Sequence, residues 1–117
     1  MLNGKKVLII DDEIDLCILL KDYFSRKNYQ VNVAHTLYDG KELLDTFCPD
    51  ILFLDNNLPD GVGWPMAPVI ASDFPSIYIV LISAFHPSLP LMPDSARYMV
   101  IEKPITLSDL NRQFHGF

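Results

Sequence analysis

Five short apolar runs, separated by longer stretches of mixed polarity, are the feature of this 117-residue sequence that most constrains its fold. Four of them are nearly continuous in apolar residues, which is typical of strands buried on both faces of a sheet, while one alternates and suits a strand nearer a sheet edge. The alternating run is Gln30–Ala34, and the others are Lys6–Ile10, Ile51–Leu54, Ile77–Ile82 and Tyr98–Ile101.

The stretches between these runs carry helical signals. Apolar residues recur every three or four positions at Leu16, Leu20, Tyr23 and Phe24, and again at Gly40, Leu43, Leu44 and Phe47. Capping-box spacing precedes the second stripe at Thr36 and Asp39, and a last helix starts near Thr106 with Asp109, ahead of Leu107, Leu110 and Phe114. Strands alternating with helices indicate right-handed βαβ units and a parallel sheet covered on both sides. The sequence therefore predicts a doubly wound α/β sandwich of the flavodoxin-like class, with five strands in the order 2-1-3-4-5.

Prolines disturb this plan in two places. The third helical region contains Pro65, Pro68 and Pro75, of which Pro68 lies close to the limit that a helix tolerates. The fourth region contains Pro87, Pro90 and Pro93, and each would remove a hydrogen bond from a regular helix. We therefore expect the fourth helix to be short or irregular.

Composition excludes several classes of protein. Half of the residues are hydrophobic, which excludes a disordered chain, and the net charge of −6 with scattered basic residues argues against direct binding of nucleic acid. The longest apolar runs are too short to span a bilayer, and the first residues lack the apolar core of a signal peptide, so we expect a cytoplasmic protein with no membrane partner. Cys17 and Cys48 lie far from any metal-binding spacing and are expected to be reduced thiols.

Polar residues stand where four of the predicted strands end, and in parallel sheets ligands bind at those ends. The first strand is followed by Asp11 and Asp12, the third by Asp55, the fourth by Ser83 and the fifth by Lys103. Neighbouring carboxylates would repel by about 4 kcal/mol at ~4 Å, so they must take up protons or share a cation. An all-oxygen donor set without histidine or thiolate favours Mg²⁺ over zinc. Taken singly, each residue has an ordinary explanation, such as a helix cap, a turn or a surface lysine, but their joint placement does not.

Four motifs in this order resemble the receiver domains of two-component response regulators. "VLIIDDE" resembles the first strand with its acid pair, "ILFLDNNLPDGVG" the phosphoacceptor segment, "VLISA" the strand that ends in a hydroxyl residue, and "IEKPI" the lysine–proline motif. The resemblance to this chemotaxis-receiver-like family covers nearly the whole chain, so residues 1–117 are expected to form a single receiver domain.

The resemblance implies roles for individual residues. Asp55 would accept a phosphoryl group from a histidine kinase or a histidine phosphotransfer protein, with Lys103 and Ser83 contacting the phosphoryl oxygens. Mg²⁺, for which Mn²⁺ could substitute, would be held by Asp12 directly, by Asp11 through water, by Asp55 and by the backbone carbonyl of Asn57. Ala84 would leave the approach to the acceptor open. The domain would catalyse only its own phosphorylation and dephosphorylation and would switch a protein-interaction surface for an unknown output domain or target.

Departures from the family pattern keep one alternative open. Val100 stands where the family commonly has an aromatic residue, and the fourth helix is broken by prolines. The alternative is a phosphorylation-independent protein-interaction module on the same fold. An aspartyl-phosphate phosphohydrolase is disfavoured because Asn57 stands where the acid/base would be, and "GVGW" lacks the third glycine of a dinucleotide-binding loop. Phe85 places an apolar ring near the acceptor, and we hypothesise that it shields the acyl phosphate from water.

Overall fold

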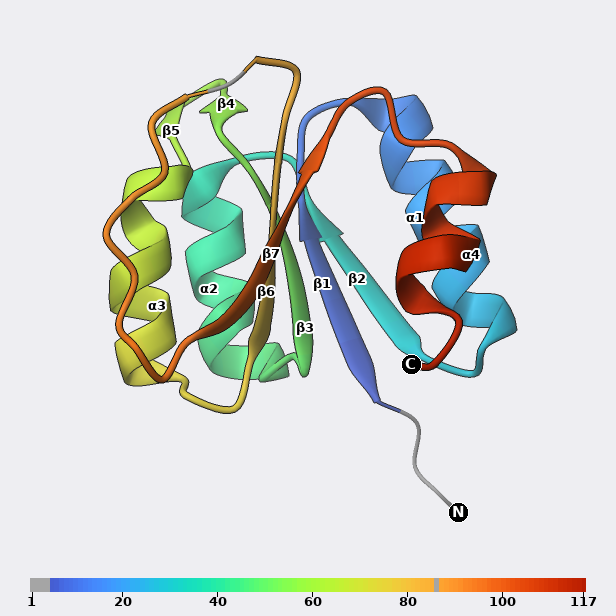
Figure 1. Ribbon diagram of the computed structural model, residues 1–117, viewed down its shortest axis with the longest axis horizontal. Coiled ribbons are helices and arrows are strands. Elements are labelled where there is room, and N and C mark those ends of the chain that lie inside the picture. The colour runs from blue at the N-terminus through green and yellow to red at the C-terminus, as the bar shows by residue number, and fades with distance from the viewer. Residues whose placement is uncertain (1–4, 86) are drawn as a thin grey trace.

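The computed structural model describes residues 5–85 and 87–117, and its central feature is a parallel sheet (Figure 1). The five strands of this sheet lie in the order β2-β1-β3-β6-β7, which is 2-1-3-4-5 when these strands alone are numbered. The predicted topology is therefore confirmed. The strands are β1 (Lys6–Ile10), β2 (Gln30–Ala34), β3 (Ile51–Asp55), β6 (Tyr78–Ser83) and β7 (Arg97–Glu102).

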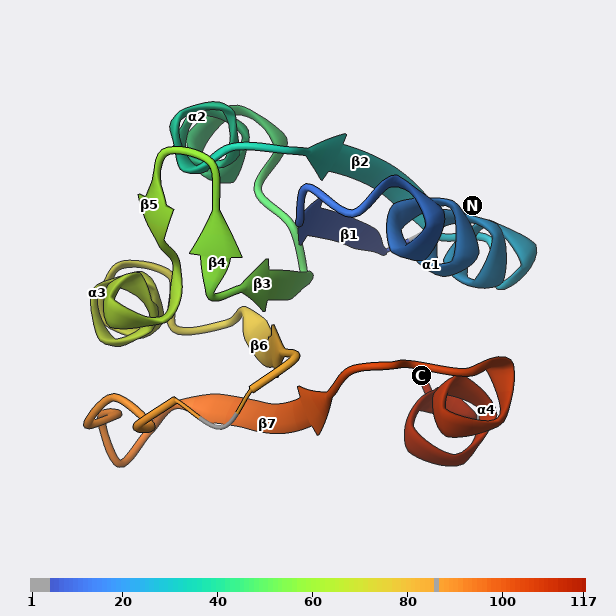
Figure 2. The ribbon, with the colours of Figure 1, turned by 90° about the horizontal axis from the view of Figure 1, so that it is seen from above.

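Helices cover both faces of the sheet, as Figure 2 shows from above. On one face lie α1 (Ile14–Arg26) and α4 (Leu107–Phe114), and on the other lie α2 (Leu37–Phe47) and α3 (Ala67–Asp73). Of the helices within residues 5–85 and 87–117, none combines the length and the apolar character that crossing a bilayer requires. This two-sided cover explains why β1, β3 and β6 are almost wholly apolar, since each is buried on both faces.

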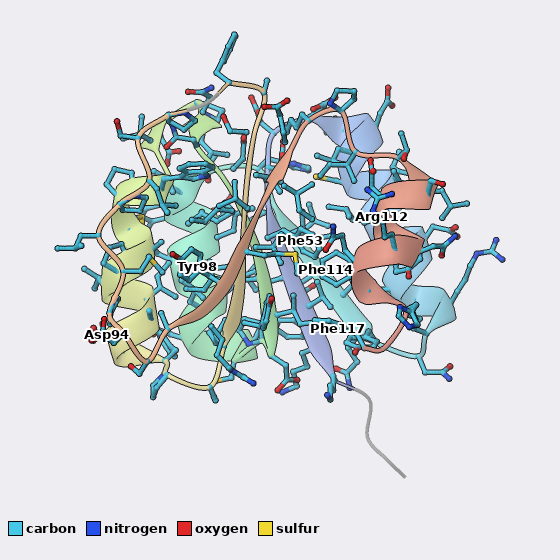
Figure 3. All side chains as sticks on the ribbon, in the orientation of Figure 1. Phe53, Asp94, Tyr98, Arg112, Phe114 and Phe117 are labelled. Carbon is cyan, nitrogen blue, oxygen red and sulfur yellow. The ribbon has the colours of Figure 1, made fainter. Side chains whose placement is uncertain are left out.

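Two apolar layers hold the sheet between the helices. The layer beneath α1 and α4 includes an aromatic cluster, in which the rings of Phe24, Phe53 and Phe114 lie 5.4 to 5.6 Å apart between centroids. Phe53 and Phe114 lie on this side in Figure 3, while Tyr98 lies on the opposite side, against the layer beneath α2 and α3. Both layers contact the central strands, so the sheet ends are held rigidly relative to one another.

The capping signals read from the sequence operate differently at the two helices. At α4, Thr106 and Asp109 form a complete capping box: the Thr106 side chain accepts from the Asp109 N–H, and the Asp109 carboxylate accepts from the Thr106 N–H. At α2, Thr36 Oγ1 also accepts from the Asp39 N–H, at 3.1 Å. Two further N–H groups of α2 donate to the carboxylate of Asp60, which lies more than twenty residues further along the chain.

The third helical region accommodates its prolines by starting late. A 3₁₀ turn, η1 (Trp64–Met66), precedes α3 and holds Pro65, and α3 itself begins at Ala67, so Pro68 lies in its first turn. A first-turn proline removes an N–H that would have no intrahelical partner anyway. Pro68 is thus compatible with a regular helix, although α3 is only seven residues long.

No helix is present in residues 87–96, the described part of the segment between β6 and β7 that follows Phe85, which confirms the expectation of an irregular fourth helix. The segment lies on the same side of the sheet as α3 (Figures 1 and 2). Met92 and Ala96 pack against the layer beneath α2 and α3, so side chains from an irregular chain partly cover the sheet where a helix would otherwise lie. Leu91, by contrast, is 94% exposed.

Candidate functional site

The site lies at the edge of the sheet where the parallel strands end, which is the top of the molecule in Figure 1. Asp11 follows β1, Asp55 is the last residue of β3, Ser83 is the last residue of β6, and Lys103 follows β7. These are the strand ends that the sequence singled out. The structure brings their side chains together because β1, β3, β6 and β7 are successive neighbours in one sheet.

Three carboxylates converge at this edge. One carboxylate oxygen from each of Asp11, Asp12 and Asp55 lies within 4.8 Å of the others. Asp11 and Asp55 are buried, at 0% and 3% exposure, whereas Asp12 is exposed. Burial raises the pKa of Asp55 to about 6, and the charge of Asp11 adds to this effect. Burial likewise raises the pKa of Asp11, although the Glu13 N–H and Lys103 partly offset it. The cluster therefore carries an unfavourable concentration of negative charge.

Lys103 is the cation within this cluster. Its Nζ lies 3.0 Å from Asp11 Oδ2, 3.1 Å from Glu13 Oε1 and 3.6 Å from Asp55 Oδ1. Burial by itself would lower the pKa of Lys103, but its close contact with the Asp11 carboxylate and the charges of the other surrounding carboxylates raise it above the usual lysine value. The lysine therefore remains charged throughout the physiological pH range and can contact a further anion.

The carboxylate of Asp11 is only partly satisfied by the protein. Its Oδ1 accepts from the Glu13 N–H at 2.8 Å, while Oδ2 is buried and has no hydrogen-bond partner of good geometry among the described residues, although the Lys103 ammonium lies nearby. The Lys103 ammonium that pairs with this buried oxygen also lies near Glu13 and Asp55, so one positive charge serves several carboxylates. The three converging carboxylates fit a hard, oxygen-preferring divalent cation such as Mg²⁺.

Ser83 places a hydroxyl beside the acceptor strand. In the β3–β6 register Asp55 lies opposite Ile82, so the next residue, Ser83, stands one position beyond the carboxylate. Ser83 is 2% exposed, and its Oγ accepts from the N–H of Phe85 at 3.2 Å. The Phe85 ring is 73% exposed, and Ala84 is exposed. The bond from Phe85 uses a lone pair of the Ser83 oxygen and not its hydrogen, so the hydroxyl can also donate to an acceptor.

The segment after Asp55 forms a tight hairpin that the sequence did not reveal. It pairs β4 (Asn57–Leu58) with β5 (Gly61–Val62) in antiparallel fashion. The hairpin is tied to α2, because the Asp60 carboxylate accepts from the N–H groups of Leu37 and Tyr38 at 2.8 and 3.0 Å, and these bonds lower the pKa of Asp60. These bonds hold the hairpin that contains Asn57 against the start of α2.

Gly63 is required by close backbone approach rather than by an unusual backbone angle. A Cβ built at Gly63 would lie 2.1 Å from the carbonyl oxygen of Asp55, a separation that no side chain tolerates. The Gly63 N–H donates to the carbonyl of Asn56 at 2.9 Å. The chain therefore folds back against the acceptor itself at this glycine.

All the residues predicted from the sequence lie at this edge, but the structure distinguishes their environments and adds partners. Asp11 and Asp55 are buried, while Asp12 and Asn57 are exposed. Glu13, Asp60 and Trp64 did not stand out as site residues. Glu13 follows the acid pair directly, which was a usable signal for its contact with Lys103. Nothing local in the sequence pointed to Asp60, because its partners lie more than twenty residues away.

Comparison with known proteins finds a matching family model and relatives of the same kind. The family model described as the response regulator receiver domain matches residues 7–114. The response regulator protein PilR of Pseudomonas aeruginosa is 30% identical over 84 residues, which is 72% of this chain but 19% of PilR. The chemotaxis protein CheY of Thermotoga maritima is 31% identical over 84 residues, covering 69% of this chain and 68% of CheY. The chain thus spans about a fifth of the length of the regulator PilR.

Solved structures share the fold. The CheY-like receiver domain protein of Methanospirillum hungatei superposes with a TM-score of 0.80 at 19% identity, covering 97% of this chain and 92% of that one. The signal receiver domain of a putative LuxO repressor protein from Vibrio parahaemolyticus gives a TM-score of 0.75 at 24% identity, covering 94% and 86%. At these identities the similarity establishes the architecture alone.

Proposed function

This chain belongs to the response regulator receiver domain family, and on that premise we propose that Asp55 accepts a phosphoryl group from a phosphohistidine. The donor would be a histidine kinase or a histidine phosphotransfer protein. The observation that supports this assignment most directly is the position of Asp55: a buried carboxylate at a strand end, 3.6 Å from the Lys103 ammonium and within the carboxylate cluster.

In the proposed phosphoryl transfer each side chain has one role. An Asp55 carboxylate oxygen attacks phosphorus, the P–O bond forms as the P–N bond to the donor imidazole breaks, and the acyl phosphate results. The attacking carboxylate must be ionised, and a pKa of about 6 leaves Asp55 mostly ionised at neutral pH. Lys103 and the Ser83 hydroxyl would each contact an oxygen of the transferred group and stabilise the charge on it.

Mg²⁺ is the cofactor that the donor set fits. Asp12 would hold it directly, Asp11 through water, and Asp55 and the backbone carbonyl of Asn57 would complete the protein's share, with Mn²⁺ able to substitute. When bound, the ion supplies positive charge that offsets the phosphoryl oxygens. The protein's own contribution is the cluster of Asp11, Asp12 and Asp55, whose negative charge exceeds the positive charge of Lys103 and would repel the phosphoryl group without a further cation.

Phosphorylation would be read by the loop that follows β6. A phosphoryl group on Asp55 attracts the Ser83 hydroxyl, whose Oγ now accepts from the Phe85 N–H. Reorientation of Ser83 would release that N–H and free the chain after it to move, which biases the interaction surface between two states. We place the switched surface at the end of β6 and along β7, and propose that residues 1–117 act as one receiver unit.

A direct experiment is phosphorylation with acetyl phosphate and Mg²⁺, followed by intact-mass measurement. We expect a gain of one phosphoryl group, which Asp55→Asn abolishes and Asp73→Asn, an exposed aspartate on α3, leaves intact. Beryllofluoride with Mg²⁺ should in addition shift amide resonances around Ser83.

The irregular segment 87–96 favours one other candidate, an interaction module that works without phosphorylation. The same experiment separates the two. A chain that gains no mass, binds no Mg²⁺ and shows no beryllofluoride-dependent shift would contradict the phosphoacceptor proposal and leave the interaction module.

A further inference from the structure

Trp64 takes no part in the proposed phosphoryl transfer, yet its backbone N–H and its indole N–H both donate hydrogen bonds at the site. It is the sole tryptophan of the chain and is 4% exposed. The residue directly follows Gly63 and begins the 3₁₀ turn η1, so it lies next to the backbone that folds against Asp55. Trp64 is thus a buried residue that donates one hydrogen bond from its backbone and one from its indole at this edge of the sheet.

Its two hydrogen bonds join the ends of two different strands. The backbone N–H of Trp64 donates to Asn56 Oδ1 at 3.1 Å, and Asn56 is the residue after the acceptor. The indole Nε1–H donates to the carbonyl oxygen of Ile82 at 3.1 Å, and Ile82 is the residue before Ser83. Since Ile82 is also the register partner of Asp55, a single residue connects the backbone around the acceptor to the backbone around the hydroxyl.

The indole also forms part of the wall beside Ser83. A cavity of about 240 Å³ next to the hydroxyl is lined by Trp64, Ser83, Phe85 and Val100 among others. From β7 the lining includes Val100, Ile101 and Glu102, none of which is aromatic, and Val100 is 50% exposed. The large ring that borders Ser83 from the protein interior is therefore Trp64, supplied by the acceptor loop rather than by β7.

We propose that Trp64 is a positioning residue for Ser83: by holding the Ile82 carbonyl, its indole fixes the backbone from which the Ser83 hydroxyl reaches a phosphoryl group on Asp55. This inference rests on the proposed phosphoacceptor function. Loss of the indole N–H would leave the Ile82 carbonyl without that donor, and the strand end would relax to find another. The hydroxyl would then lose its alignment, while Asp55, Lys103 and the acidic cluster would keep theirs.

A double-mutant cycle tests this coupling, with the rate of Asp55 phosphorylation by phosphoramidate as the readout. Trp64→Phe keeps an aromatic ring and removes the N–H, and Ser83→Ala removes the hydroxyl. In the unmodified chain we expect Ser83→Ala to slow phosphorylation about tenfold or more, as loss of a hydrogen bond to a charged group does. In the Trp64→Phe background the same change should slow it less than about threefold, because the hydroxyl is already misaligned.

Ile70→Val provides the matched control, since Ile70 is buried on α3 in the same apolar layer as Trp64 but does not line the cavity beside Ser83. In that background Ser83→Ala should keep its full effect. If Trp64→Phe does not fold, replacement of the sole tryptophan by benzothienylalanine, which has sulfur in place of the N–H, gives the same comparison with the ring shape preserved.

The outcomes are distinct. Equal effects of Ser83→Ala with and without the indole N–H, in a chain that is phosphorylated on Asp55, would overturn the role of Trp64 and leave the phosphoacceptor function standing. Failure of the unmodified chain to be labelled by any donor would overturn both. A smaller effect of Ser83→Ala in the Trp64→Phe chain but not in the Ile70→Val chain would support the inference. So would a change in the tryptophan fluorescence of the unmodified chain on adding beryllofluoride and Mg²⁺.

Discussion

Lys103 and Asp11 form an ion pair of 3.0 Å in which the carboxylate is fully buried and the lysine side chain is 14% exposed. A pair of this kind compensates for the burial of both charges only while both partners are present. The same ammonium lies 3.6 Å from Asp55, so its removal would leave two buried carboxylates facing each other.

Replacement of Lys103 should therefore destabilise the folded protein. We expect Lys103→Met to lower the free energy of unfolding by about 3 kcal/mol, the usual cost of breaking a buried pair, when measured by urea denaturation without Mg²⁺ at pH 7. Arg26→Ala is the control, because its 3.0 Å pair with Asp22 is exposed and should be worth less than ~0.5 kcal/mol. Equal effects of the two changes would show that the charge cluster is not held together by the lysine.

The ionised carboxylate of Asp55 should lower the stability of the folded protein. Because its carboxylate is buried beside Asp11, Asp55→Asn removes a repulsive charge, and we expect the variant to be more stable than the unmodified chain by on the order of 2 kcal/mol at pH 7 without Mg²⁺. Thermal or urea unfolding measures the gap. Mg²⁺ at saturating concentration should shrink it, since only the unmodified chain regains a neutralised cluster; a gap that Mg²⁺ leaves unchanged would contradict this account.

The sign of the pH dependence follows from the same group. The pKa of Asp55 is about 6 in the folded protein, compared with 3.8 for an aspartate free of the fold, so the folded state binds a proton more tightly than the unfolded state. The contribution of this group to stability is therefore present at low pH and is lost as pH rises from about 4 to about 6.

Other groups act in the opposite direction, so the comparison must isolate Asp55. Asp60 and Asp109 have pKa values below the usual one, because backbone N–H groups bind their charged forms, and they favour the fold at higher pH. We expect the stability difference between Asp55→Asn and the unmodified chain to be small near pH 4 and to grow until about pH 6.5. A difference that does not vary with pH would contradict the raised pKa.

Gly63 should tolerate no side chain. Gly63→Ala would place a Cβ 2.1 Å from the Asp55 carbonyl oxygen, and relief requires the acceptor backbone itself to move. We expect a loss of roughly 3 kcal/mol in unfolding free energy, together with slower phosphorylation. Gly116→Ala serves as the control, because nothing lies within 4 Å of a Cβ there. Normal phosphorylation of a folded Gly63→Ala chain would show that the acceptor position is less constrained than the geometry indicates.

The lifetime of the acyl phosphate tests the hypothesis about Phe85. If its ring shields phosphorus from water, Phe85→Ala should speed dephosphorylation several-fold, as followed by loss of the labelled species after removal of the donor. Leu91→Ala is a suitable control, because that side chain is 94% exposed and does not line the cavity beside Ser83. Identical lifetimes in all three chains would end this hypothesis.

Much of the fold was readable locally. The five apolar runs, the helical stripes between them and the prolines of residues 87–93 predicted the strands, the helices and the irregular fourth helix, because these patterns depend on the repeat of one strand or one helix. The strand order followed from the alternation of strands and helices, which indicates a doubly wound parallel sheet. The site residues Asp11, Asp12, Asp55, Ser83 and Lys103 were readable for a related reason: each stands at a strand end, and the ends of parallel strands meet at one edge.

Tertiary structure alone decided how those residues differ. Asp11 became the buried partner of Lys103 while its neighbour Asp12 stayed exposed, because side chains of successive residues point in different directions where a strand gives way to a loop. The capping of α2 by Asp60 and the bridge from Asn56 through Trp64 to Ile82 are contacts between residues 8 to 23 positions apart in the chain. No periodic pattern encodes such contacts, because they depend on where packing places each loop. The sequence by itself determined which groups gather at the sheet edge, and packing determined which of them are buried, paired and held in position.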